Sequence, residues 1–128
     1  ETKAATAHKI LARPSGFWNN TGVFKPAGIQ MVVTHVSGVW RSNPHWGPTD
    51  AGGNGDLLAK DTYLRPGEPE GCLIGKIGGD NEGGGSTTFA IGNHGYIPTD
   101  LEGLIWLTVN DEKRGFGDNR RSIWVSIS

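Results

Sequence analysis

The chain has 128 residues with 21 glycines, 7 prolines, one cysteine and a formal net charge of −1. Glycine greatly exceeds the roughly 7% of an average protein, yet no Gly-X-Y period indicates collagen and no proline-rich run indicates a disordered linker. The balanced charge argues against nucleic acid as a partner, and no apolar run approaches the ~20 residues that cross a bilayer, so membrane insertion is not expected.

Short apolar runs bounded by turn residues predict β-strands. The expected strands, in chain order, are Gly22–Lys25, Gln30–Thr34, Gly38–Arg41, Leu73–Ile77, Ser86–Ile91, Leu104–Asn110 and Ser122–Ser128. In the last strand Ile123, Val125 and Ile127 alternate with other residues and should share one buried face. No window shows the apolar period of a helix. The pattern predicts an all-β fold, an antiparallel β-sandwich formed by residues 1–128 as a single domain.

Residues 42–71 separate two of these strands and are rich in proline and glycine. A loop of this length in a compact domain is usually functional or forms an irregular cap. The apolar stretch that follows begins with Cys72, which we expect to be a buried structural thiol.

The loop between the last two strands carries the most informative polar residues. Asp111, Asp118 and Asn119 offer side-chain oxygens, and Gly115 and Gly117 allow tight backbone folding. Ca²⁺ takes six to eight oxygen ligands and tolerates irregular geometry, so the loop is a candidate calcium site. Alternatively, these residues only cap turns, in which Asp, Asn and Gly are common.

Several segments together resemble the small calcium-dependent galactose-binding lectins of the PA-IL (LecA-like) family. The similarity covers roughly residues 21–128, and its motifs are Gly38–Trp40, Trp46–Pro48, Gly71–Gly78, Leu104–Asp111 and Gly117–Asn119.

The resemblance implies a jelly-roll-like, galactose-binding-domain-like β-sandwich. It also implies that one Ca²⁺ lies at the sandwich edge and coordinates two neighbouring hydroxyls of a galactose-like sugar. The metal ligands carried over by position are Asn43, Asp111, Gly115, Asp118 and Asn119. The expected sugar-binding residues are Asn43, Trp46, Asn54, Asp56, Asp111, Glu112 and Asp118.

The chain also departs from the family pattern. Asp118 replaces an asparagine and adds a negative charge, and Arg120–Arg121 replaces a small Ser-Gly pair at the rim. The family's sugar-contacting segment has only a loose counterpart in Gly53–Leu57, which contains no histidine. The choice of sugar is therefore open.

Aromatic side chains suggest a different kind of site. Trp18, Trp46 and Tyr63 lie in loop-like sequence and could hold a polysaccharide without calcium, the Asp/Asn loop then being only structural. Trp106 and Trp124 lie in apolar strands and are expected in the core.

The sequence motifs disfavour an enzyme. Carboxylates are abundant, as glycosidases require, but no nucleophile elbow and no zinc motif occurs. We expect a non-catalytic, bacterial, secreted or extracellular module or lectin. Its partners would be a galactoside or other polysaccharide, together with a linked catalytic domain of a glycan-active enzyme or further copies of itself.

Overall fold

The computed structural model of the chain describes residues 6–42, 45, 47–82 and 88–128. These residues form β-strands and one short 3₁₀ helix, and none of them belongs to a long amphipathic helix. The elements are β1 (Thr6–Leu11), β2 (Asn19–Lys25), β3 (Met31–Arg41), β4 (Asn54–Leu58), β5 (Pro69–Glu70), β6 (Leu73–Ile77), β7 (Thr88–Ala90), β8 (His94–Ile97), β9 (Gly103–Val109), η1 (Lys113–Asp118) and β10 (Arg120–Ile127).

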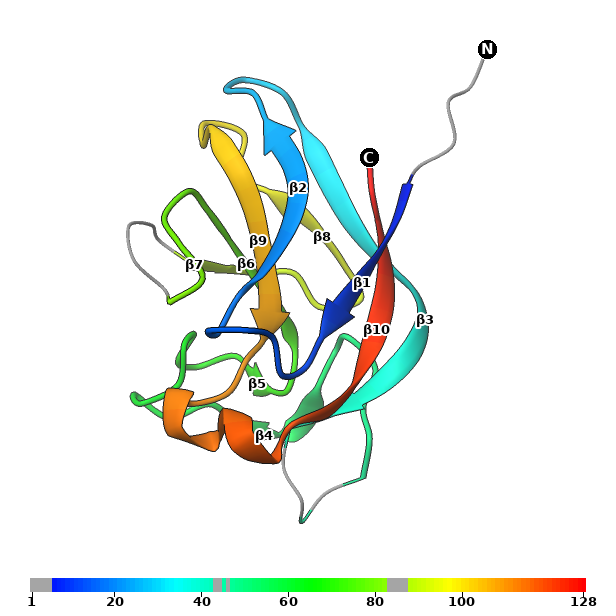
Figure 1. Ribbon diagram of the computed structural model, residues 1–128, viewed down its shortest axis with the longest axis vertical. Helices are drawn as coiled ribbons and strands as arrows, with labels where there is room; N and C mark the ends of the chain where they lie inside the picture. Colours follow the sequence, from blue (N-terminus) through cyan, green and yellow to red (C-terminus); the bar gives the residue numbers. More distant parts are fainter. Residues whose placement is uncertain (1–5, 43–44, 46, 83–87) are drawn as a thin grey trace.

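Two four-stranded sheets make the layers of the molecule. One has the strand order β1-β10-β3-β8 and the other β2-β9-β6-β7, and every paired neighbour is antiparallel. A small β4-β5 sheet and η1 lie together at one end, at the bottom of Figure 1. The antiparallel β-sandwich predicted from the sequence is confirmed.

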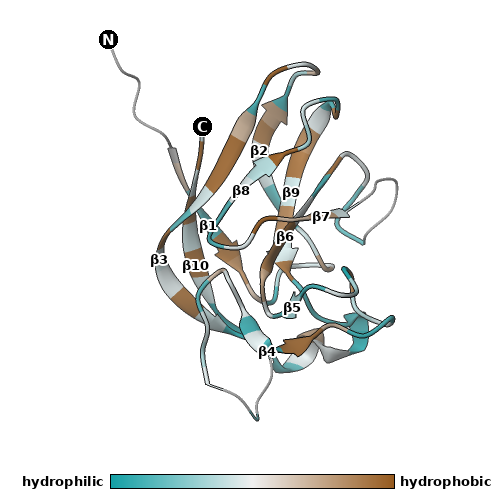
Figure 2. Ribbon diagram, turned by 180° about the vertical axis from the view of Figure 1, so that it is seen from behind, coloured by the Kyte–Doolittle hydropathy of each residue, from teal (hydrophilic) through white to brown (hydrophobic). Residues whose placement is uncertain are grey.

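The core lies between the two sheets. Ile123 and Val125 are fully buried and Ile127 nearly so, which confirms the expected shared face of β10. Ile105 and Leu107 of β9 belong to the same buried cluster. Figure 2 shows hydrophobic residues along β3, β9 and β10. Alternation along β10 and the fully buried strand β6 thus supply apolar surface that holds the layers together.

Most expected strands occur with small shifts of their ends. β6 matches the prediction at both ends, whereas two predicted strands, Gln30–Thr34 and Gly38–Arg41, form the single strand β3. The expected break is a bulge, because Gly38 has a φ of 88° and the register with β10 shifts between Trp124 and Val125. Glycine suits this place, since a Cβ there would lie 2.9 Å from the Ser122 carbonyl oxygen.

Other strands had no apolar signal of their own. β1, β4, β5 and β8 are short or polar and are recruited by pairing, as β1 is along the edge of β10. In the expected strand Ser86–Ile91 the first two residues lie outside the described part, and β7 covers Thr88–Ala90. The described residues contain no helix long and apolar enough to cross a membrane.

The tryptophans only partly follow the expected division. Trp106 is buried as predicted, but Trp124 is 42% exposed, so its placement in the core is corrected. Its side chain points away from the buried face that Ile123 and Val125 occupy, because successive strand residues face opposite ways. Cys72 is buried as expected, and burial raises the pKa of its thiol to about 12.

The buried side chain of Asn110 fixes the 59–72 loop to the end of β9. Its Oδ1 accepts the Arg65 N–H at 3.0 Å and its Nδ2 donates to the Arg65 carbonyl at 2.8 Å. Its backbone N–H donates to the Cys72 carbonyl at 2.8 Å, and its carbonyl accepts the Gly71 N–H at 2.9 Å. These bonds hold the irregular loop against the residue that precedes Asp111.

We expect Asn110→Ala to destabilise the fold, because it leaves the N–H and the carbonyl of Arg65 without their partners. The free energy of unfolding should fall by about 2 kcal/mol, measured by urea denaturation with tryptophan fluorescence. Gln30→Ala removes an exposed amide and is the matched control. Equal denaturation midpoints for the two variants would contradict the role of Asn110.

Candidate functional site

A hollow of about 180 Å³ lies at the end of the sandwich that carries β5 and η1. We call it the acidic hollow because four of its residues are carboxylates. Its lining residues are Ser42, His45, Tyr63, Glu70, Asp111, Glu112, Gly115 and Asp118. Four of the predicted site residues, Asp111, Glu112, Gly115 and Asp118, therefore come together.

The loop after β9 folds around Asp111. The Gly115 N–H donates to the Glu112 carbonyl at 2.9 Å, which closes the first turn of η1. Phe116 is buried and its ring meets that of Phe17 edge to face at 5.3 Å, so the turn is anchored in the core. The Gly115 backbone consequently runs beside the carboxylate, and a Cβ at this position would lie 3.1 Å from Asp111 Oδ1.

Asp111 and Asn119 each bury an oxygen that lacks a hydrogen-bond donor. Asp111 is 3% exposed, and its Oδ1 accepts the Glu112 N–H at 2.8 Å, whereas its Oδ2 has no partner among the described residues. Asn119 is 1% exposed, and its Nδ2 donates to the Ala12 carbonyl at 2.9 Å, whereas its Oδ1 has no partner in that part of the chain. Such orphaned oxygens are uncommon in folded proteins.

Burial raises the pKa of Asp111 to about 7. The Glu112 N–H and the nearby Asn119 amide favour the charged form, but they offset only part of the desolvation, to which the negative charges of Glu70 and Glu112 add. The same surroundings raise the pKa of Tyr63 to about 12, through burial first and then through the charges of Glu70, Asp111 and Glu112. The hollow therefore disfavours further negative charge and favours a cation.

The other carboxylates differ in their contacts. Glu70 is 7% exposed and Asp118 is exposed at the rim. Glu112 Oε2 accepts the Thr62 hydroxyl at 2.9 Å and lies 3.6 Å from Arg114 Nε. In the part of the chain that the structure describes, no three His, Cys, Asp or Glu side chains are grouped as a metal centre. A cation here would need amide and backbone oxygens as well as carboxylates.

Two further predicted residues, Asn54 and Asp56, do not join this hollow. Asn54 and Asp56 lie on β4 and are absent from its lining, and Asn54 Oδ1 accepts the Asp56 N–H at 3.1 Å. Asn43 and Trp46 lie outside the described residues, so their roles stay predictions.

The structure places the two described aromatic residues of the predicted platform, Trp18 and Tyr63, in different surroundings. Trp18 is 2% exposed and packs with Cys72, Ile74 and Trp106, so its predicted place on a surface platform is corrected. Its ring is buried because the turn before β2 folds it onto the outer side of β6 and β9. Tyr63 is half-buried and lines the acidic hollow.

Two residues of the hollow, Glu70 and Ser42, belong to none of the sequence motifs that predicted the site. Both are about 40 or more residues from Asp111 in the chain, and only the folding of the 59–72 loop and the end of β3 brings them to it.

No protein-family model matches the chain, and no curated protein matches its sequence. Among solved structures, the chain is similar to one described as the EclA N-terminal domain, a PllA-like lectin. The TM-score is 0.65 at 22% sequence identity, over 94% of this chain and 92% of that chain. This similarity shows that the chain shares the β-sandwich fold of that lectin domain.

Burial of Asp111 predicts an unusual pH dependence of stability when EDTA is present. Its folded pKa of about 7 lies above the ~3.9 of an unfolded aspartate, so the folded state holds the proton between these values. The stability from this group is complete below about pH 4 and is lost as the pH rises through about 7, with a slope of at most ~1.4 kcal/mol per pH unit.

Urea unfolding at several pH values between about 4 and 8 measures this slope. Asp111→Asn should flatten it, whereas Asp100→Asn, which alters an exposed carboxylate, should follow the unchanged protein. Identical slopes for Asp111→Asn and the unchanged protein would refute the burial of an unpaired carboxyl.

Proposed function

We propose that this chain is a calcium-dependent carbohydrate-binding domain that binds a galactose-like sugar and catalyses no reaction. The observation that carries the proposal is the pair of buried oxygens without donors, Asp111 Oδ2 and Asn119 Oδ1. Leaving a buried polar atom unpaired costs about 1–3 kcal/mol. One cation between these residues would satisfy both oxygens and neutralise the Asp111 carboxylate.

The donor types fit Ca²⁺. Asp111, Asp118 and Asn119 supply carboxylate and amide oxygens, and the Gly115 backbone passes beside the Asp111 carboxylate. Ca²⁺ prefers such hard oxygen ligands and accepts irregular geometry. Glu70, which raises the pKa of Asp111 by its charge, is a further candidate ligand that the sequence did not indicate. The contribution of the Asn43 carbonyl stays part of the proposal.

When bound, Ca²⁺ supplies coordination positions that two neighbouring sugar hydroxyls can fill. The chain's own residues would orient those hydroxyls. Asp118 at the rim accepts their hydrogen bonds, and Asp111 contributes through the charge it places beneath them. Bonds to a carboxylate are roughly twice as strong as neutral ones. The lectin description of the similar structure supports a carbohydrate as the ligand.

Two other functions receive less support. The aromatic platform without calcium loses Trp18, which is buried. Glycoside hydrolysis would need a carboxyl that reaches the glycosidic oxygen, but Asp111, the group whose pKa suits a general acid, is only 3% exposed.

Open sugar sites bind weakly, and linked copies or a tethered partner raise their effective affinity. We therefore propose that the domain acts either as a homo-oligomer or beside a covalently linked catalytic domain. We also propose that it acts outside the bacterial cell.

Calcium should stabilise the protein through Asp111. At a concentration of 100 times its Kd, Ca²⁺ should add about 2.7 kcal/mol to the free energy of unfolding, seen as a higher Tm than in EDTA. Asp111→Asn should lose this increase, and Asp100→Asn should keep it. An equal calcium-induced rise in Asp111→Asn would place the ion elsewhere.

Isothermal titration with a methyl galactoside and with neutral galactan should show binding in calcium and none in EDTA. Asp118→Asn should weaken binding about tenfold, because a charge-assisted hydrogen bond becomes a neutral one. Trp18→Phe should bind as the unchanged protein does. Binding that survives both EDTA and Asp111→Asn would exclude the calcium mechanism, and release of reducing ends from the galactan would show an enzyme.

A further inference from the structure

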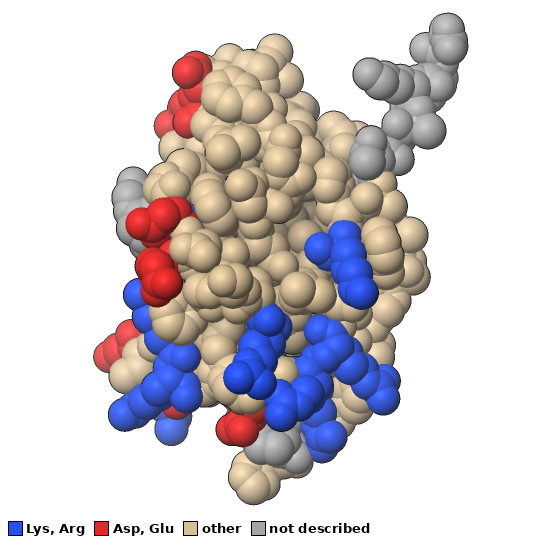
Figure 3. Space-filling model, in the orientation of Figure 1, with Lys and Arg blue, Asp and Glu red and all other residues tan. Residues whose placement is uncertain are grey.

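A second hollow, which we call the basic groove, is lined by the end of β1, Arg13 and the start of β10. It measures about 360 Å³, and its lining includes four cations, Lys9, Arg13, Arg120 and Arg121, together with Leu11. Figure 3 shows Lys and Arg side chains gathered over this lower part of the face, while acidic side chains lie mainly along the left edge. The chain as a whole has a formal charge of −1, so this positive charge is local.

The cations of the groove are available to a ligand. None of the described residues that line the groove is acidic. Within the described part of the chain, no carboxylate forms an ion pair with Lys9, Arg13 or Arg121. Cations placed together without counter-charges repel one another, and an anion between them removes that repulsion.

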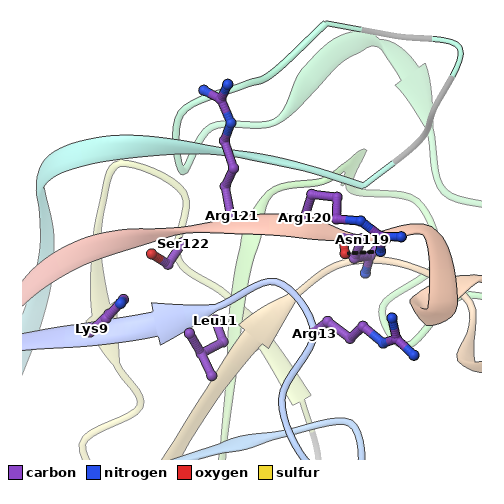
Figure 4. Close-up of a pocket in the computed structure, with 7 residues that line it drawn as sticks. All are labelled: Lys9, Leu11, Arg13, Asn119, Arg120, Arg121 and Ser122. Carbon is purple, nitrogen blue, oxygen red and sulfur yellow. Dashed lines mark hydrogen bonds between the residues drawn. The ribbon is translucent and has the colours of Figure 1, made fainter.

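The backbone holds two of the arginines apart. Arg121 has a φ of 70°, a left-handed conformation that non-glycine residues rarely adopt. Its carbonyl accepts the Ala12 N–H at 3.1 Å, and it pairs with Trp40 of β3, so its neighbours hold this conformation. Figure 4 shows the Arg121 and Arg120 side chains diverging from adjacent positions on β10. Both arginines line the groove.

Arg120 links the groove to the loop of the acidic hollow. Its Nη1 donates to the carbonyls of Gly117 and Asn119, each at 2.8 Å, which orients the guanidinium (Figure 4). Asp118 lines the acidic hollow and the next residue, Asn119, lines the groove. The two hollows thus adjoin each other along the segment 117–120.

We propose that the basic groove binds an anionic group, a sulfate ester or a carboxylate, on a glycan whose neighbouring sugar occupies the acidic hollow. This inference rests on the proposed function and narrows its substrate class to acidic glycans. Leu11, which is 40% exposed, offers an apolar surface to a sugar ring between the cations.

Charge placement favours such a glycan over nucleic acid. A nucleic acid carries phosphates continuously along its backbone. Beyond the segment 117–120 that backbone would meet the carboxylates of Glu70, Glu112 and Asp118. A glycan with a single anionic substituent matches one basic and one acidic hollow side by side.

The test is isothermal titration in calcium with four probes: a sulfated galactan oligosaccharide, its desulfated form, an oligogalacturonate and single-stranded DNA. The sulfated or uronate probe should bind at least tenfold more tightly than the desulfated one, and the advantage should shrink with added salt. The double variant Arg13→Gln/Arg121→Gln should lose that advantage and keep its affinity for the neutral galactan.

The control is the double variant Lys60→Gln/Lys113→Gln, which removes the same charge from exposed positions that line neither the groove nor the acidic hollow. It should keep the preference for the anionic probe. Circular dichroism and the calcium-dependent rise in Tm show that each variant is folded.

The outcomes separate the two proposals. Neutral galactan binding without any preference for the anionic probes overturns the groove and leaves the proposed function intact. Anionic probe binding that persists in EDTA and is lost in Arg13→Gln/Arg121→Gln supports the groove and overturns the calcium mechanism. DNA that binds as tightly as the sulfated probe, or equal losses in both double variants, overturns the groove as a glycan site.

Discussion

The buried amide of Asn110 is the contact on which the end of the sandwich that carries the acidic hollow depends. The sandwich itself is held by apolar burial between two sheets, but its lower end is closed by irregular backbone that no apolar alternation can order. Asn110 bonds Arg65, Cys72 and Gly71 through side chain and backbone. Asn110 thereby places the loop that carries Glu70 close to Asp111, the next residue in the chain.

Close backbone packing at that end explains part of the glycine excess. A Cβ at Gly53 would collide with the backbone of Cys72 and Glu70, and Gly71 receives the Trp40 indole N–H on its carbonyl at 2.8 Å. Glycine at these positions allows two backbone segments to pack closely, and it does not serve to make the loop flexible. This close packing holds Glu70, which lines the acidic hollow, against the segment around Gly53.

One short segment, 117–120, separates two surfaces of opposite charge. The Asp118 carboxylate lines the acidic hollow, and Arg120 lines the basic groove. The carbonyls of Gly117 and Asn119 hold the Arg120 guanidinium. Close opposite charges give a surface that discriminates between ligands by the spacing of their charged groups. Burial of Asp111 makes the acidic side costly when empty, so a cation there would stabilise the fold as well as the site.

Local patterns determined the sandwich and part of the site. A short apolar run located β6 and alternation located β9 and β10. The loop after β9 joined Asp111, Gly115 and Asp118, because these features depend on residues close in sequence. Only the tertiary structure decided that Trp18 is buried, that Trp124 is exposed and that Glu70 and Tyr63 reach Asp111. The same holds for the basic groove, where β1 has no apolar signal and lies beside β10 through edge pairing. Contacts between distant segments are set by loop paths and sheet edges, and such information is absent from the periodicity of any single strand.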